Sequence, residues 1–160
     1  MKFLNRVRLI KKEPEIVLGL LDLVIGKYIG SGCYRDVYHH TTNDKWVVKI
    51  MNDKEANSNL LEFEIWQTVK DTPWGKWFAG CIWCSDNGKA MIQEKVEPIS
   101  KNNVHLIPDK IPYFFTDIKP TNFGFINNQL VCHDYDMSLI RFVDDGLNNK
   151  MRSSKDLKKL

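Results

Sequence analysis

The chain has 160 residues, of which 43% are hydrophobic and 27% are charged, and its net charge is +3. A chain of this length can bury roughly 70% of its unfolded surface, so the composition indicates one globular domain and excludes a mainly disordered chain. The longest apolar stretch, residues 16–25, contains Asp22 and is shorter than the roughly 20 residues of a membrane-spanning helix. No membrane partner is therefore expected.

The charge is concentrated at the two ends of the chain. Residues 1–12 contain five lysines or arginines and no acid, and residues 150–160 contain five with one aspartate. Such ends can bind nucleic acid, but solvated termini are the commoner case, so nucleic acid is not an expected partner. The four cysteines are too few for a disulfide scaffold, and no signal-peptide cleavage site follows the basic N-terminus. These features predict reduced thiols in a cytoplasm.

The first predicted elements surround a glycine turn. Residues 13–26 fit a short helix or a lead-in strand, with Pro14 in the first helical turn and Gly26 at the exit. From residue 27 the pattern becomes extended on both sides of the Gly-Ser-Gly turn at residues 30–32. This pattern predicts a β-hairpin.

A third strand and a helix are expected next. Residues 45–50 are rich in β-branched and aromatic side chains, which predicts a strand with Lys49 near its end. Residues 53–70 then change to a helical period, with Asn52 or Asp53 as the N-cap.

Two further hairpins complete the pattern. The apolar runs 80–85 and 89–96 are separated by an Asp-Asn-Gly turn, and residues 123–126 precede residues 130–134 across two adjacent asparagines. Strands therefore dominate, and one clear helix is inserted after the third strand. The predicted fold class is α+β.

The glycine turn and the third strand carry a candidate phosphate site. A glycine pair in a hairpin is most often only a turn, but Gly30 and Gly32 lack a Cβ, so the backbone there can approach phosphate groups closely. Val37 follows in the second strand. Lys49 lies late in the third strand, where its ammonium group can reach the α and β phosphates of a nucleotide.

A lysine inside a cleft needs an anion, and the predicted helix offers Glu62 and Glu64. We choose Glu62 as the partner of Lys49, because apolar residues follow it at helical spacing. The alternative is that either acid lies on the surface of the helix.

Residues 117–136 contain the most specific motif. Asp117, Lys119 and Asn122 lie in the pattern Asp-x-Lys-Pro-x-Asn, and Asp134 and Asp136 follow in Asp-Tyr-Asp. Phosphoryl transfer requires an acid that accepts a hydroxyl proton, a lysine beside the transferred group, and an Asn and an Asp that hold Mg²⁺. The motif supplies each of these groups in sequence order.

In this order the residues resemble the active site of eukaryotic-type protein kinases over residues 24–138. The resemblance implies an antiparallel small-lobe sheet with one inserted helix and a strongly reduced C-lobe. It also implies ATP and Mg²⁺ as cofactors. The implied nucleotide-binding residues, which include a hinge, are Gly30, Gly32, Val37, Lys49, Glu62, Glu94 and Val96. The implied catalytic residues are Asp117 and Lys119. The implied metal ligands are Asn122, Asp134 and Asp136.

The resemblance divides the single kinase-like domain into an N-terminal extension (1–23), a small lobe (24–96), a reduced catalytic core (97–145) and a basic tail (146–160). Between the hinge and the catalytic loop only twenty residues remain, too few for the long helices that support this loop in protein kinases. In this respect the chain is similar to the short kinase-like proteins of bacteriophages. That similarity implies a location in the host cytoplasm.

Several positions depart from the protein-kinase pattern. Arg35 replaces the third glycine of the loop, and Phe-Thr at residues 115–116 replaces the His-Arg before the catalytic Asp, so control by a phosphorylated activation loop is not expected. Residues 134–136 lack the usual glycine and are closer to the ending of aminoglycoside and choline kinases. Gly124 stands where the adenine floor of a protein kinase usually has a large apolar side chain. Tight binding of adenine is therefore not expected unless Phe123 or Phe125 supplies this floor.

Three functions compete at this point. The leading hypothesis is a minimal ATP-dependent phosphotransferase that acts on protein serine or threonine hydroxyls. The alternative is a pseudokinase-type binding module that inhibits or remodels a partner protein, which the missing substrate-binding helices favour. Nucleotidyl transfer, with ATP reversed in the cleft, is a third possibility.

Two further expectations concern surfaces and metals. Apolar residues 111–115 and 137–143 are expected to form an exposed patch that a homodimer or a partner protein covers, unless they fold back under the catalytic loop. A zinc site made by the cysteine pair at residues 81 and 84 with Cys132 and His133 is disfavoured. The reason is that residues i and i+3 of a regular strand point to opposite faces.

Overall fold

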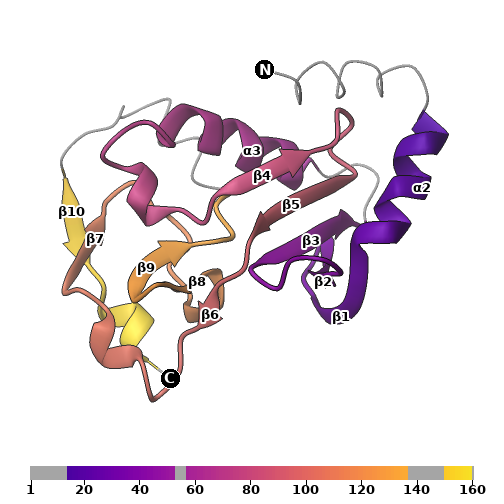
Figure 1. Ribbon diagram of the computed structural model, residues 1–160. Coiled ribbons are helices and arrows are strands. Elements are labelled where there is room, and N and C mark those ends of the chain that lie inside the picture. The colour runs from indigo at the N-terminus through magenta and orange to yellow at the C-terminus, as the bar shows by residue number, and fades with distance from the viewer. Residues whose placement is uncertain (1–13, 53–56, 137–149, 160) are drawn as a thin grey trace.

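The computed structural model describes residues 14–52, 57–136 and 150–159 (Figure 1). Its N-terminal part contains the helices α2 (Pro14–Val24) and α3 (Ser58–Val69). The strands of this part are β1 (Ile25–Ser31), β2 (Arg35–His40), β3 (Trp46–Met51), β4 (Cys81–Cys84) and β5 (Ala90–Glu94). They form one antiparallel sheet in the order β1-β2-β3-β5-β4.

Both predicted hairpins of this sheet are confirmed. β1 and β2 are joined through the glycine turn, and β4 and β5 through a turn in which Gly88 has a positive φ of 68°. β3 lies between β2 and β5, so Lys49 is paired with Val37 on one side and with Met91 on the other. This register places Lys49 in the middle of the sheet, where its side chain is buried.

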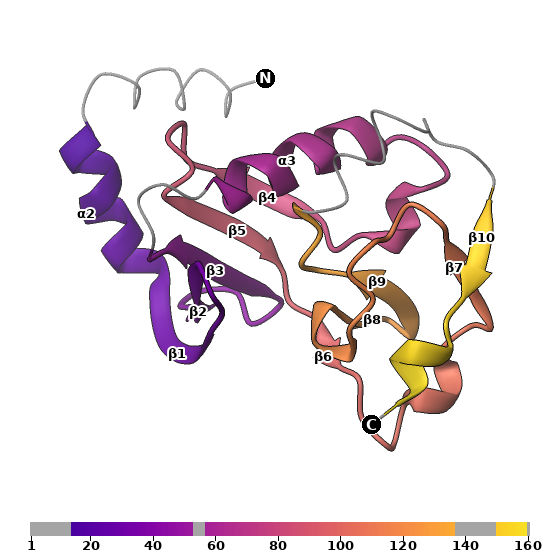
Figure 2. The same ribbon diagram turned by 180° about the vertical axis from the view of Figure 1, so that it is seen from behind.

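Helix α3 lies against the sheet next to β4 (Figures 1 and 2). Its buried residues include Glu62, Ile65 and Val69, which share one face at the spacing i, i+3 and i+7. The buried face of α3, which also contains Ser58 and Asn59, therefore brings one carboxylate to the sheet.

The start of α3 differs from the prediction. The helix begins at Ser58, and its N-cap is Asn57, which makes no side-chain capping hydrogen bond. The prediction of Asn52 as the N-cap is therefore wrong, and Asp53 lies outside the described residues. The polar residues before the helix give no capping pattern from which the true start could be located.

The described residues after β5 form two small sheets. β6 (Glu97–Pro98), β8 (Phe123–Ile126) and β9 (Gln129–Cys132) make one, and β7 (Lys110–Pro112) pairs with β10 (Met151–Ser153). Asn127 and Asn128 have positive φ angles of 50° and 64°, which makes the tight turn predicted between β8 and β9. Among the described helical segments after β5 are the short 3-10 turns Val104–Leu106, Pro120–Asn122 and Lys155–Lys158.

A cluster of buried aromatic rings joins the two parts. Phe78 stacks on Phe114 with ring centroids 5.7 Å apart and meets Tyr135 edge-on at 4.9 Å. Phe115 lies 5.2 Å from Phe78 and also 5.2 Å from Phe123. The cluster fixes the segment before Asp117 and the segment after β9 relative to the larger sheet.

The exposed patch predicted for residues 111–115 is not present. All of these residues except Tyr113 are buried, because the C-terminal segment packs beside them: β10 pairs with β7, and Leu157 is fully buried. Residues 150–159 are thus part of the fold. The other half of the predicted patch, residues 137–143, lies outside the described residues. One of the two reasons to expect a dimer is therefore removed.

Residues 13–26 were predicted to be a helix that ends at Gly26 or a strand. The helix is present as α2, but Gly26 lies inside β1, where an added Cβ would lie 2.7 Å from the carbonyl oxygen of His39. Glycine is needed there because β1 and β2 approach closely. Neither α2 nor any other helix among the described residues has the length and hydropathy of a bilayer-spanning segment.

The argument from strand alternation against a zinc site is also wrong. A β-bulge shifts the pairing of β4 between Cys81 and Trp83, so Cys81 pairs with Gln93 and Cys84 with Met91. Both cysteines therefore lie on the same face of the sheet.

Candidate active site

A buried ion pair between β3 and α3 is at the centre of the site. Lys49 Nζ lies 3.0 Å from Glu62 Oε2 and 2.5 Å from the carbonyl oxygen of His133. Asn59 supports the pair, because its Nδ2 donates to the carbonyl oxygens of Lys49 at 3.2 Å and Gly88 at 3.0 Å. The side chains of Lys49 and Glu62 are only 5% and 0% exposed, so water does not screen their attraction.

A second cation, Arg35, binds the other oxygen of Glu62. Its Nη2 lies 2.9 Å from Glu62 Oε1 and also donates a hydrogen bond to Asp134 Oδ1. Arg35 is the first residue of β2 and is buried. The glycine pattern alone assigns no role to Arg35. The one sequence feature that could have pointed to Arg35 was a long cationic side chain at the position of the third glycine of the kinase loop.

The two cations keep Glu62 ionised. Burial alone would raise the pKa of Glu62, but the charges of Lys49 and Arg35 and their hydrogen bonds lower it to about 2. Burial likewise opposes the charged form of Arg35, yet Glu62 and Asp134 raise the pKa of Arg35 above its ordinary value. The buried charges therefore hold one another in their ionised forms.

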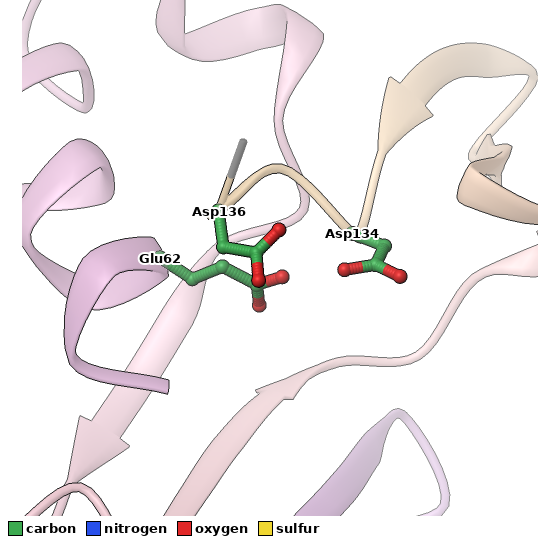
Figure 3. A group of neighbouring side chains, drawn as sticks. All are labelled: Glu62, Asp134 and Asp136. Carbon is green, nitrogen blue, oxygen red and sulfur yellow. The ribbon is translucent and has the colours of Figure 1, made fainter. Parts of the chain in front are cut away.

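Three carboxylates converge beside this ion pair (Figure 3). Glu62 comes from α3, and Asp134 and Asp136 come from the segment after β9; oxygen atoms of all three lie within 4.8 Å of one another. Burial and the charge of Glu62 raise the pKa of Asp134, although Arg35 opposes this effect. A group of carboxylate oxygens that repel one another in this way fits a hard cation such as Mg²⁺.

The Asp-x-Lys-Pro-x-Asn segment forms a compact loop. Asp117 Oδ2 accepts hydrogen bonds from Lys119 Nζ at 3.0 Å and from Asn122 Nδ2 at 2.9 Å. Asn122 Nδ2 also donates to the backbone oxygen of Asp117 at 3.1 Å, which leaves Asn122 Oδ1 as the atom able to bind a metal ion. The Asp117 side chain is 39% exposed, so a hydroxyl group can reach it.

His133 connects this loop to the ion pair. Its backbone N–H donates to the carbonyl oxygen of Asn122 at 2.9 Å, and its own carbonyl oxygen accepts from Lys49. The predicted residues of the catalytic loop, the third strand and the helix are therefore linked by a continuous chain of hydrogen bonds. No sequence pattern pointed to His133 as the connecting residue.

The glycine turn is open toward its surroundings. An added Cβ at Gly30 would meet nothing within 4 Å, and at Gly32 the nearest atom is the Arg35 carbonyl oxygen at 3.9 Å. Neither glycine has a positive φ. The fold itself therefore does not require glycine at either position. Val37, which pairs with both Gly30 and Lys49, places the turn beside the ion pair.

The predicted hinge residues have structural contacts of their own. Glu94 Oε2 accepts a hydrogen bond from the backbone N–H of Gly80 at 2.7 Å. Val96 lies against Gly124, where an added Cβ would lie 2.7 Å from Val96 Cγ2 and 2.6 Å from the Glu97 carbonyl oxygen. Gly124 is therefore explained by the close approach of the hinge to β8.

Phe123 and Phe125 do not act as the substitute adenine floor suggested above. Both side chains are buried in the hydrophobic core, and Phe123 packs edge-on against Phe115. The ring of Phe123 joins β8 to the aromatic cluster, and Phe125 lies in the hydrophobic core.

A zinc site receives no support from the described residues. Within them, Glu62, Asp134 and Asp136 form the one group of three or more His, Cys, Asp or Glu side chains that are close enough to share an ion. Burial also raises the pKa of Cys81 to about 12, which favours the protonated thiol over the thiolate that binds zinc.

No protein-family model matches the sequence, and no curated protein sequence matches it. Two similar solved structures are the ternary complex of APH(2")-IIa with streptomycin and ATP, and the ADP-bound aminoglycoside phosphotransferase APH(2'')-Ib. Each has a TM-score of 0.50 and aligns with 78% of this chain and 70% of its own, at 14% and 12% sequence identity. The chain therefore has an α+β kinase-like fold, as the sequence predicts.

The partly buried His133 side chain predicts a pH dependence of stability. Burial and the charge of Lys49 lower the pKa of His133 to about 4. Between pH 6.5 and 4 the unfolded chain binds a proton that the folded chain does not, so stability falls as the pH is lowered through this range. Melting temperatures measured at pH 6.5, 5.5 and 4.5 should decrease less steeply for His133→Asn than for the wild type. The same slope in both proteins, with the exposed His105→Asn as control, would contradict the assignment.

Proposed function

We propose that the chain is a minimal ATP- and Mg²⁺-dependent phosphotransferase. The observation that carries the proposal is the buried pair of Lys49 and Glu62, joined by hydrogen bonds to the Asp117–Asn122 loop and by Arg35 to Asp134. An acceptor hydroxyl on protein serine or threonine is the prediction from sequence. The similarity in fold to two aminoglycoside phosphotransferases adds a hydroxyl of a small molecule as the other acceptor to test.

In the proposed reaction, Asp117 orients the acceptor hydroxyl and takes its proton. The acceptor oxygen forms a bond to the γ-phosphorus while the bond from that phosphorus to the bridging oxygen breaks, and ADP leaves. Lys119, which lies 3.0 Å from Asp117, stabilises the transferred group. Lys49, held in place by Glu62, binds the α and β phosphates.

The remaining predicted residues bind the nucleotide and the metal. The backbone at Gly30 and Gly32 covers the phosphates, and Asn122, Asp134 and Asp136 supply the oxygen ligands. Mg²⁺ bound there would neutralise charge on the phosphate oxygens. The hinge near Val96 would hold the base of the nucleotide.

Nucleotide binding is tested by thermal unfolding. Millimolar ATP with Mg²⁺ should raise the melting temperature, because a ligand that binds only the folded state stabilises it by mass action. Lys49→Met should reduce the shift, since it removes the cation proposed to bind the phosphates. If calorimetry at high protein concentration shows no heat and no shift with ATP, ADP or GTP, nucleotide binding is wrong.

The reaction type is tested with ATP labelled separately at the α and γ positions. Transfer of the γ label supports the phosphotransferase, and transfer of the α label supports nucleotidyl transfer. Binding of ATP without transfer of either label to casein, histone or an aminoglycoside supports the pseudokinase.

The pseudokinase remains the second candidate because Arg35 already binds Asp134, one of the proposed metal ligands. A protein of this kind would use the fold to inhibit or remodel a partner. Four further statements stay predictions from sequence. They are the resemblance to bacteriophage proteins, the location in a host cytoplasm, the homodimer and the domain boundaries.

A further inference from the structure

The side chain of Arg35 lies among the carboxylates that fit a metal ion. Its guanidinium group is bonded to Glu62 and Asp134 together, and these are two of the three acids whose oxygens lie within 4.8 Å of one another. An arginine at the start of a strand beside an open turn could extend into water. Arg35 is instead only 7% exposed, and Asn59 Oδ1 lies 3.5 Å from its Nη1.

The negative charges of the cluster explain why the Arg35 guanidinium group is held between Glu62 and Asp134. Lys49 compensates one of the three carboxylates, and Arg35 compensates a second. Without Arg35 the fully buried Glu62 would lose one of its two cationic partners, and Asp134, whose side chain is 41% exposed, would add an uncompensated negative charge beside it, which is costly. A divalent ion between the same carboxylates would remove this cost in the same way.

We infer that Arg35 is a built-in cation that takes the place of a divalent metal ion between Glu62 and Asp134. The folded protein then needs no metal at this position, and Glu62 stays a partner of Lys49 and Arg35 and is never a metal ligand. A metal ion that accompanies the nucleotide, which rests on the proposed function, is left with the outer oxygens of Asp134 and Asp136 and with Asn122. Arg35 is thus a positioning residue that limits the number of ions in the site.

The test compares the wild type with Arg35→Gln, with Mn²⁺ or Mg²⁺ alone and no nucleotide. In EDTA, Arg35→Gln should melt at a lower temperature than the wild type, and millimolar Mn²⁺ should restore most of the loss while leaving the wild type unchanged. Titration calorimetry should show that Arg35→Gln binds Mn²⁺ at least about tenfold more tightly than the wild type, since one unit of positive charge beside the ion has been removed. Adding Asp134→Asn should abolish the rescue.

Two variants serve as controls. Arg35→Lys keeps the charge and should show little rescue by Mn²⁺. Arg152→Gln removes a partly buried arginine that donates to the Phe115 carbonyl oxygen and lies over the Tyr113 ring, so any loss of stability there should not respond to metal.

Equal rescue of Arg35→Gln and Arg152→Gln by Mn²⁺ would overturn the inference. If Arg35→Gln fails to fold in both EDTA and Mn²⁺, the wild type decides. A rise in the melting temperature of the wild type in millimolar Mn²⁺ without nucleotide, lost in Asp134→Asn, would show that Arg35 does not exclude the ion, and an unchanged melting temperature would support the inference. Because every readout is free of nucleotide, a protein that shows the rescue but binds no ATP would refute the proposed function and leave the role of Arg35 intact.

Discussion

Replacement of Asp117 by Asn is expected to lower the transfer of phosphate from ATP by at least about 100-fold, the lower end of what a positioned acid or base contributes. The carboxylate accepts hydrogen bonds from Lys119 and from Asn122. An amide at this position presents an NH₂ group to one of these donors and cannot take a proton from a hydroxyl. The affinity for ATP should stay nearly unchanged, because Asp117 acts on the acceptor and not on the nucleotide.

Asp109→Asn is a matched control for this variant. Asp109 is also an exposed aspartate with a lysine partner, since Lys158 Nζ lies 3.0 Å from its Oδ1, but it precedes β7 and is outside the hydrogen-bonded site. Transfer of the γ label should persist in Asp109→Asn and be lost in Asp117→Asn. Equal transfer by the wild type and Asp117→Asn would remove the proposed mechanism.

The parts of the fold that local chemistry determines were predictable from the sequence. The β4–β5 and β8–β9 turns need residues with positive φ, and Gly88 and the pair Asn127-Asn128 supply them. The strands themselves follow from runs of β-branched and aromatic residues. The same local logic placed Lys49 near the end of a strand and Glu62 on the helix after it.

The predictions that failed depend on contacts between distant residues or on irregular backbone. The burial of residues 111–115, except Tyr113, requires β10, which follows about forty residues later and pairs with β7. The shared face of Cys81 and Cys84 results from a bulge that strict alternation cannot show.

Arg35 illustrates the same limit within the site. Its partners Glu62 and Asp134 are 27 and 99 residues away along the chain. The glycine-loop motif therefore shows only that its third glycine is replaced, and does not indicate what Arg35 binds. Except for Arg35, the charged residues of the candidate site were predicted from motifs, but how they neutralise one another was not, because charge compensation depends on the arrangement of the whole group.

The second large effect is expected for Glu62→Gln, which keeps the shape of the side chain and removes its charge. Lys49 and Arg35 then lose the anion they share, and breaking a buried ion pair in this way costs about 3–5 kcal/mol. That is a large share of the roughly 5–15 kcal/mol by which such domains are stable, so the melting temperature should fall sharply.

The exposed Glu64, two residues along the same helix, supplies the control. Glu64→Gln should change the free energy of unfolding by less than about 0.5 kcal/mol, as is usual for surface positions. The double variant Lys49→Met with Glu62→Leu should lose less stability than the sum of the two single changes, because it removes both charges and leaves neither buried alone. Chemical denaturation of the six proteins, which are the wild type, Glu62→Gln, Glu64→Gln, Lys49→Met, Glu62→Leu and the double variant, measures these differences. Equal stability of Glu62→Gln and Glu64→Gln would show that the pair with Lys49 does not hold α3 against the sheet, and the site would then lack the fixed lysine on which the proposed nucleotide binding depends.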